Sequence, residues 1–226
     1  MEKLVKTIFP PKCIVCGRYG RSMCHRCLSG CKKIDIGRCI VCQEPSVGGE
    51  THAACFNSGV PNTLFSSFEY EGSVRECIRR AKYNSMEFDA LKDLTMEGLR
   101  YAWKAGIFYS EMLVVPIPLS PKRIKFRGFN QAEVIARKVA EFYKLKTDFR
   151  LLKRTKETLP LSELSRAERL KEMKSVFVAR PEFVAGKKIL LVDDVCTTGS
   201  TLISCSQSLM AAEAVEVQCF TVAAVL

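Results

Sequence analysis

The sequence lacks any long run of apolar residues. Apolar residues make up 47% of the 226 positions, but no window approaches the roughly 18 uninterrupted apolar residues expected of a membrane-spanning helix. A secretory signal is also missing, because Glu2, Lys3 and Lys6 interrupt the short N-terminal stretch. These two absences predict a globular cytoplasmic protein without a transmembrane helix.

Acidic residues are in deficit. The sequence has 24 Asp and Glu against 35 Lys and Arg, which gives a formal charge of +11. Such a charge favours a polyanionic partner such as nucleic acid, or an anionic small substrate. Surface lysines also serve solubility and are abundant in proteins from hot environments. Charge alone therefore leaves nucleic-acid binding open.

Histidine is scarce, whereas cysteine is abundant and unevenly placed. Only His25 and His52 occur, while eight of the twelve cysteines lie in the first 55 residues. A gap of two residues lets a tight turn present two ligands to one tetrahedral zinc ion. Four pairs have this gap: Cys13 with Cys16, Cys24 with Cys27, Cys39 with Cys42, and His52 with Cys55.

The four pairs predict one or two structural zinc ions. Disulfides and a redox Cys-x-x-Cys site are the alternatives, but no secretion signal places the chain in an oxidising compartment, and redox sites do not use four pairs in series. Four protein ligands leave no position for water, so the metal would stabilise a segment too small to build its own core. Cys31 and His25 are expected to bind no metal.

A strand, turn and helix pattern near the C-terminus is typical of a phosphate site. Ile189–Val192 is a short apolar run that predicts a buried parallel strand, and Asp193 and Asp194 stand where it is expected to end. A hydroxyl-rich turn over 197–201 precedes a predicted helix over 202–210. This arrangement would direct backbone N–H groups and a helix dipole at one place. It lacks the Gly-Lys-Ser/Thr ending of a Walker A loop.

Residues 190–201 (LLVDDVCTTGST) resemble the phosphoribosyl-pyrophosphate (PRPP) signature of type I phosphoribosyltransferases. The resemblance implies that the two aspartates hold the ribose hydroxyls, or a magnesium ion carried with the phosphates, and that the turn wraps the 5′-phosphate. The implied PRPP site consists of Asp193, Asp194, Val195, Cys196, Thr197, Thr198, Gly199, Ser200 and Thr201.

The chain between the cysteines and this motif alternates between strand and helix patterns. We expect strands over 63–70, 112–115 and 215–222, and helices over 73–83, 88–105 and 131–143. The turn-rich stretch 57–62 marks a boundary between a zinc ribbon domain, residues 1–60, and a second domain, residues 61–226. The second domain is predicted to be an α/β fold of the type I phosphoribosyltransferase kind, a mainly parallel sheet flanked by helices.

Two further stretches, 116–120 (PIPLS) and 127–132 (RGFNQA), are similar to the ComF family of competence-associated proteins, as are 70–72, 82–83 and 164–169. Members couple an N-terminal zinc ribbon to a phosphoribosyltransferase-like domain. The chain departs from the family pattern at Leu161 and Glu172, in a segment that would touch an acceptor. Pro116 and Pro118 also lack the N–H donors that a diphosphate loop normally offers.

A phosphoribosyl transfer requires cations and N–H donors that stabilise the departing diphosphate. The candidates for diphosphate or DNA contacts are Arg123, Lys125, Arg127 and Lys82, the first three on a mobile segment able to close over the ligand. Arg127 joins Asp193 and Asp194 as a candidate catalytic residue, whereas Lys125 also fits a solvated charged face. No nucleophile or general base is evident.

The family resemblance implies a DNA-uptake protein of natural transformation that binds single-stranded DNA and keeps a pocket for PRPP or a related phosphosugar. Aromatic residues near the basic positions, Tyr83, Phe126 and Phe129, would stack bases. One alternative is an active phosphoribosyltransferase, a glycosyltransferase, acting on an unidentified base or amine. Another is an adaptor whose ribbon docks a competence helicase.

Overall fold

The computed structural model of the protein describes residues 10–57, 59–82, 88–155 and 176–226. The expected features at Tyr83, at Leu161, over 164–169 and at Glu172 lie outside these ranges. Within the described part of the chain, no helix is long and apolar enough to cross a membrane.

A five-stranded sheet forms the centre of the molecule. Its order is β3 (Thr63–Glu69), β9 (Glu216–Ala224), β8 (Lys188–Cys196), β4 (Met112–Pro116) and β5 (Lys146–Thr147), and every neighbouring pair is parallel. The prediction of a mainly parallel α/β sheet is confirmed. A separate antiparallel pair, β6 (Leu152–Arg154) with β7 (Phe177–Ala179), lies beside it.

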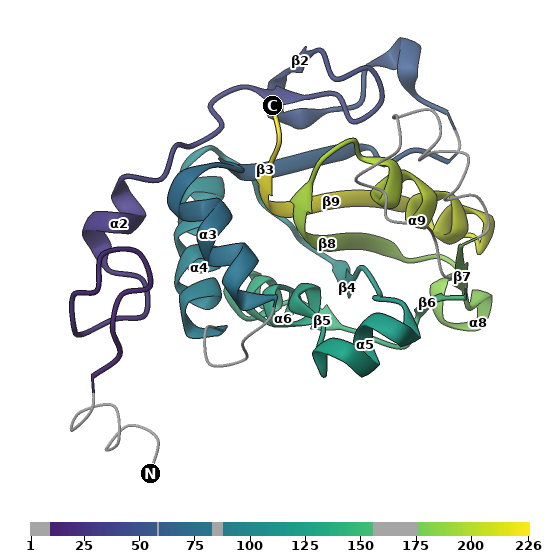
Figure 1. The fold of residues 1–226 in the computed structure, drawn as a ribbon. Coiled ribbons are helices and arrows are strands. Elements are labelled where there is room, and N and C mark those ends of the chain that lie inside the picture. Colours follow the sequence, from purple (N-terminus) through teal and green to yellow (C-terminus); the bar gives the residue numbers. More distant parts are fainter. Residues whose placement is uncertain (1–9, 58, 83–87, 156–175) are drawn as a thin grey trace.

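Helices cover both faces of the sheet (Figure 1). On one face lie α3 (Gly72–Ala81), α4 (Phe88–Lys104) and α6 (Gln131–Tyr143), and on the other lies α9 (Ser200–Ala211). Two shorter helices, α5 (Pro121–Arg127) and α8 (Pro181–Val184), belong to the connections.

Alternate residues of the central strands supply two cores. In β8, Leu190 and Val192 pack with α3, α4 and α6, whereas Ile189 and Leu191 pack with α9. Because all four side chains are fully buried, β8 is apolar on both faces, as expected of a central parallel strand.

The cysteine-rich segment runs along the outer strand β3. It contains α2 (His25–Ser29), β1 (Gly37–Arg38), β2 (Pro45–Ser46) and the 3-10 turns η1 (Val47–Gly49) and η2 (Ala53–Cys55). The N–H of Ile34 donates to the carbonyl of Ser67 at 3.1 Å, and Glu50 forms an isolated bridge with Thr63. The segment therefore covers a sheet edge that would otherwise expose unpaired backbone groups.

Two local expectations are wrong. The central strand does not end at Val192 but continues to Cys196, because β9 keeps pairing with it as far as Ala224. Asp193 and Asp194 are therefore strand residues. The basic stretch expected to be a mobile segment is the helix α5, in which the Ser120 hydroxyl accepts from the N–H of Arg123 and Pro121 occupies the first turn.

Candidate functional site

Asp193 and Asp194 lie where the sheet narrows. The partner strand β4 stops opposite Val192, whereas β9 still pairs with β8 at the aspartates. The side chain of Asp194 forms an ion pair with Lys82, with 3.1 Å between Oδ2 and Nζ, and the N–H of Asp194 donates to Oδ1 of Asp193 at 2.8 Å. Two acids and one cation thus meet at the carboxyl edge of the sheet, the usual ligand edge of such folds.

Burial and charge set the protonation of this cluster. Burial raises the pKa of Asp193 to about 8, and the negative charge of Asp194 acts in the same direction. Burial disfavours the charged form of Lys82, but the carboxylate of Asp194 outweighs it and raises the Lys82 pKa. The cluster therefore favours a ligand that brings positive charge or hydroxyl donors to Asp193.

The hydroxyl-rich turn leads from β8 into the N-terminus of α9. Gly199 precedes the helix with φ 76°, and no side chain caps the first turn. The hydroxyls of Thr198 and Ser200 lie 3.0 Å apart. Uncapped N–H groups at the positive end of a helix of this length suit an anion.

Ile40 of the cysteine-rich segment packs against Gly199 of the turn. A Cβ on Gly199 would lie 2.7 Å from Cγ1 of Ile40 and 3.2 Å from its carbonyl oxygen, so only glycine fits here. Ile40 is fully buried and stands between Cys39 and Cys42. The cysteine-rich segment thus contacts the turn directly, a contact that no motif in the sequence indicated.

Both sets of predicted metal ligands come together. The first cysteine group consists of Cys13, Cys16, Cys24 and Cys27, and the second consists of Cys39, Cys42, His52 and Cys55. Within each group the ligand atoms lie within 4.8 Å of one another.

The spacing of these ligand atoms suits zinc. The sulfurs of Cys16 and Cys24 are 3.7 Å apart. Tetrahedral zinc with Zn–S bonds of about 2.3 Å would place two sulfurs roughly 3.8 Å apart. Four thiolates, or three with one imidazole, are the donor sets of structural zinc, so both groups fit that ion.

His52 is oriented for metal binding. Its Nδ1 lies 3.4 Å from the sulfur of Cys42, while its Nε2 lies 3.2 Å from the carbonyl oxygen of Pro45. An imidazole that donates Nε2–H to this carbonyl has its Nδ1 lone pair free for the metal, the usual arrangement around a ligating histidine.

Neither Cys31 nor His25 belongs to the two groups. Cys31 is buried, its thiol donates to the carbonyl of Cys27 at 3.3 Å, and burial raises its pKa to about 11. Burial also disfavours the thiolate of Cys13, but backbone N–H donors of Cys24, Cys16 and Val15 outweigh this effect and lower the Cys13 pKa to about 6. Cys31 is therefore set apart by its position outside both groups and not by its pKa, because burial also raises the pKa of Cys55, a member of the second group, to about 11.

The basic candidates divide between two places. Arg123, Lys125 and Arg127 lie on α5, which follows the carboxyl end of β4, and the Arg127 guanidinium donates to Oε1 of Gln131 at 3.3 Å. Lys82 instead belongs to the aspartate cluster.

The remaining candidates have different surroundings. Phe126 on α5 is 79% exposed, whereas Phe129 packs edge-on against Phe88 with ring centres 4.4 Å apart. Cys196 is buried at the end of β8, and its carbonyl accepts from the N–H of Val225. Of these three residues, only Phe126 has a side chain exposed enough to contact a partner.

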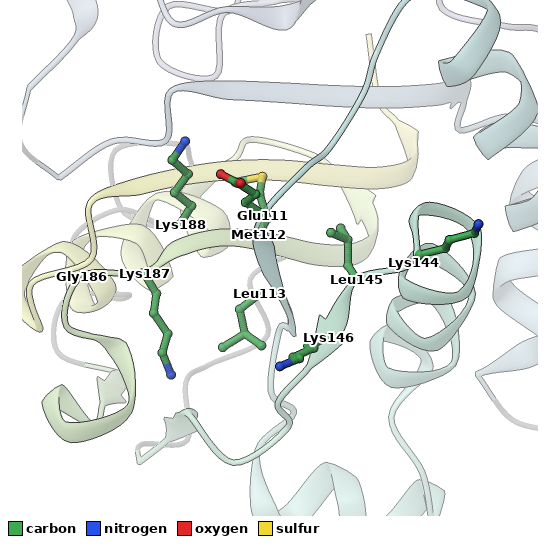
Figure 2. A pocket seen from close by; sticks show the side chains of 9 residues that line it. All are labelled: Glu111, Met112, Leu113, Lys144, Leu145, Lys146, Gly186, Lys187 and Lys188. Carbon is green, nitrogen blue, oxygen red and sulfur yellow. The ribbon is translucent and has the colours of Figure 1, made fainter.

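The sequence did not indicate a cavity of about 620 Å³ at the opposite, amino-terminal edge of the sheet (Figure 2). Lysines from separate stretches of the chain line it, so no local motif marks it. Its lining residues are Glu111, Met112, Leu113, Lys144, Leu145, Lys146, Gly186, Lys187 and Lys188.

We predict that the two metal groups differ in their effect on the turn. Cys16→Ser and Cys42→Ser each alter one exposed ligand, and each should reduce bound zinc from two ions per chain to one. Because Ile40 contacts Gly199, only Cys42→Ser should accelerate amide exchange over 197–203, by roughly ten-fold or more. Metal analysis and hydrogen-exchange mass spectrometry measure both effects. Equal exchange in the two variants would contradict the coupling.

We also predict a pH effect from Asp193. Its folded pKa is higher than its usual value near 3.8, so the folded state holds this proton more tightly than the unfolded state. Wild-type stability should therefore fall as pH rises from about 4 to about 8, relative to Asp193→Asn. Thermal unfolding at several pH values, with Asp148→Asn directly after β5 as a control, measures the difference. Parallel curves for wild type and Asp193→Asn would refute it.

A family model described as "Phosphoribosyl transferase domain" matches residues 124–226. Competence protein F of Haemophilus influenzae is 33% identical over 108 residues, which cover 46% of this chain and 47% of that protein, so the match spans about half its length. Competence protein ComFC of Bacillus subtilis is 28% identical over 192 residues, covering 80% of this chain and 74% of the relative.

Among solved structures, the glutamine PRPP amidotransferase of B. subtilis, complexed with ADP and GMP, is 19% identical. It superimposes with a TM-score of 0.41 over 60% of this chain and 26% of that one. The match to the transferase domain covers β5, β8 and β9 of the parallel sheet. The chain is similar to competence proteins of the ComF kind, and its residues 124–226 match the phosphoribosyl transferase domain.

Proposed function

We propose that the protein acts in the cytoplasm in DNA uptake during natural transformation, where it binds single-stranded DNA and holds PRPP or a related phosphosugar. The observation that carries the phosphosugar site is the cluster of Asp193, Asp194 and Lys82 beside the uncapped N-terminus of α9. The competence role is supported by relatives named as competence proteins. The net charge of +11 supports a nucleic-acid partner.

Each part of the site has a distinct task in this proposal. Carboxylates accept hydrogen bonds, so Asp193 and Asp194 receive the two ribose hydroxyls. The N–H groups and hydroxyls of 197–201 donate to the 5′-phosphate. Lys82 lies within reach of the same ligand and balances the charge of Asp194. Asp193 and Asp194 would also hold a magnesium ion bound to the diphosphate, and that ion would neutralise its charge.

The first cysteine group supplies a surface for a protein partner. It lies beside α3 and α4 and projects from the sheet (Figure 1). Arg21 anchors it to Asp93 of α4, with 3.1 Å between the charged atoms. In this proposal the projecting part docks a competence helicase, so that single-stranded DNA passes directly between the two proteins.

An alternative function is phosphoribosyl transfer to an unidentified base or amine. The observation that favours it is the match of the transferase family model over 124–226, which includes the uninterrupted stretch 190–201. In that reaction a nitrogen of the acceptor forms a bond to the anomeric carbon and loses a proton to solvent, while the bond from that carbon to the diphosphate breaks and the diphosphate leaves with the electron pair. Arg127, beside Gln131 at the start of α6, would stabilise that charge.

Magnesium-PRPP should bind to the wild type in a calorimetric titration. The double variant Asp193→Asn/Asp194→Asn removes the acceptor charges and should weaken binding by about ten-fold or more. Glu141→Gln/Glu182→Gln, which neutralises two exposed carboxylates on α6 and α8, is the charge-matched control and should bind as the wild type does. Absence of binding to the wild type would refute the phosphosugar site.

Phosphoribosyl transfer is tested by measuring the release of diphosphate. We expect no release of diphosphate from magnesium-PRPP when the protein is incubated with a panel of nucleobases and amines. Release that depends on one acceptor, and that Asp193→Asn/Asp194→Asn abolishes, would instead establish a transferase. Release by the double variant as well would point to a contaminating enzyme and leave the expectation standing.

A further inference from the structure

We infer that single-stranded DNA binds at the amino-terminal edge of the sheet, across a groove of lysines and an adjoining pair of exposed aromatic rings. This inference rests on the proposed function, because it locates the DNA that the protein is proposed to bind. It places the DNA away from α5, where the sequence had indicated contacts. DNA bound there would leave the proposed phosphosugar site at the carboxyl edge uncovered.

The lysine groove is the cavity of about 620 Å³ described above. Lys144 caps the end of α6 and Lys146 begins β5, while Lys187 directly precedes β8 and Lys188 begins it. In Figure 2, Lys187 and Lys146 flank Leu113, while Lys188 and Lys144 point away on either side. Parallel pairing of β4 with both β5 and β8 brings these stretches together.

The charge of the groove is strongly positive. Four of its lining residues are lysines and one, Glu111, is acidic. Lys188 lies 3.9 Å from Glu216, but Lys144, Lys146 and Lys187 form no ion pair with any carboxylate of the described residues. All four lysines are exposed. Uncompensated ammonium groups around one hollow suit successive phosphates of a nucleic-acid backbone.

An aromatic pair, Trp103 and Phe108, lies at the same edge of the sheet. The rings contact edge-on with centres 4.5 Å apart, yet Trp103 is 52% and Phe108 57% exposed. Phe142 and Tyr143 support them, with ring centres 6.0 and 6.2 Å from Trp103. Large aromatic side chains left half in water beside one another are typical of a binding surface.

Chain continuity joins the aromatic pair to the lysine groove. Tyr143 ends α6 and Lys144 follows it, so the aromatic support and the first lysine are consecutive residues. The hydroxyl of Tyr143 donates to the carbonyl of Ile107 at 2.9 Å, which fixes the loop that carries Phe108. A basic groove beside aromatic rings binds the backbone of a single strand and stacks its bases, whereas paired bases of a duplex are not free to stack.

The two sites are at opposite ends of one strand. Lys188 begins β8 and Asp194 lies six residues later, a separation of roughly 20 Å at about 3.3 Å per residue. DNA at the amino edge and a phosphosugar at the carboxyl edge would therefore bind at the same time.

Trp103 provides the measurement, because it is the one tryptophan of the chain. Titration with oligo(dT) should quench its fluorescence in the wild type. Lys144→Glu/Lys146→Glu/Lys187→Glu should weaken binding by about ten-fold or more and make the salt dependence shallower by about 2 in log–log slope. Phe108→Ala should weaken binding without changing that slope. The lysine variant should still bind magnesium-PRPP as the wild type does, which shows that it folds.

The charge-matched control is Lys122→Glu/Arg123→Glu/Lys125→Glu on α5, which should retain DNA affinity. If this variant loses DNA affinity and the groove variant retains it, the inferred location is wrong, although the protein still binds DNA. If the wild type binds no oligo(dT), the DNA part of the proposed function fails as well. A change in Trp103 emission with anionic vesicles but not with oligo(dT) would assign the surface to a membrane and overturn the inference.

Discussion

The parallel pairing of β8 with two strands of unequal length determines where Asp193 and Asp194 lie in this protein. Along its first half, β8 is held by β4 on one side and β9 on the other, and its side chains are buried in two cores. Beyond Val192, β9 is the one described strand that still pairs with β8. Asp193 is therefore held by its pairing with Thr221 of β9, and the side chain of the next residue, Asp194, forms the ion pair with Lys82.

Local patterns predicted those parts of the molecule that depend on neighbouring residues. The helix expected over 131–143 is α6, and its start depends on the residue directly before it, because the side chain of Asn130 caps the helix. Cysteine spacing likewise predicted both metal groups, because each turn is built from consecutive residues. By contrast, the end of β8 depends on its pairing with β9, which is distant in sequence. The change from apolar residues to Asp193 and Asp194 therefore predicts the end of the strand too early.

The same reasoning explains why the lysine groove was not predicted. Lys146 and Lys188 are far apart in the chain and neither stands in a motif; only their common neighbour β4 brings them to one edge. The contact of Ile40 with Gly199 is also non-local. Ser120 and Pro121 are typical of the start of a helix and mark the start of α5. The prediction of a mobile segment rests instead on the basic side chains.

The order of the sheet has a consequence for biosynthesis. During translation β3 is made first and β9 last of the five strands, yet they are neighbours, paired from Thr63 with Gln218 to Glu69 with Ala224. Until β9 leaves the ribosome, β3 has no partner on that side, and Phe65 and Phe68 lack the core contacts that bury them in the finished molecule. Long-range pairing of this kind is slow and leaves apolar surface exposed to aggregation, so the nascent chain is a natural client for chaperones.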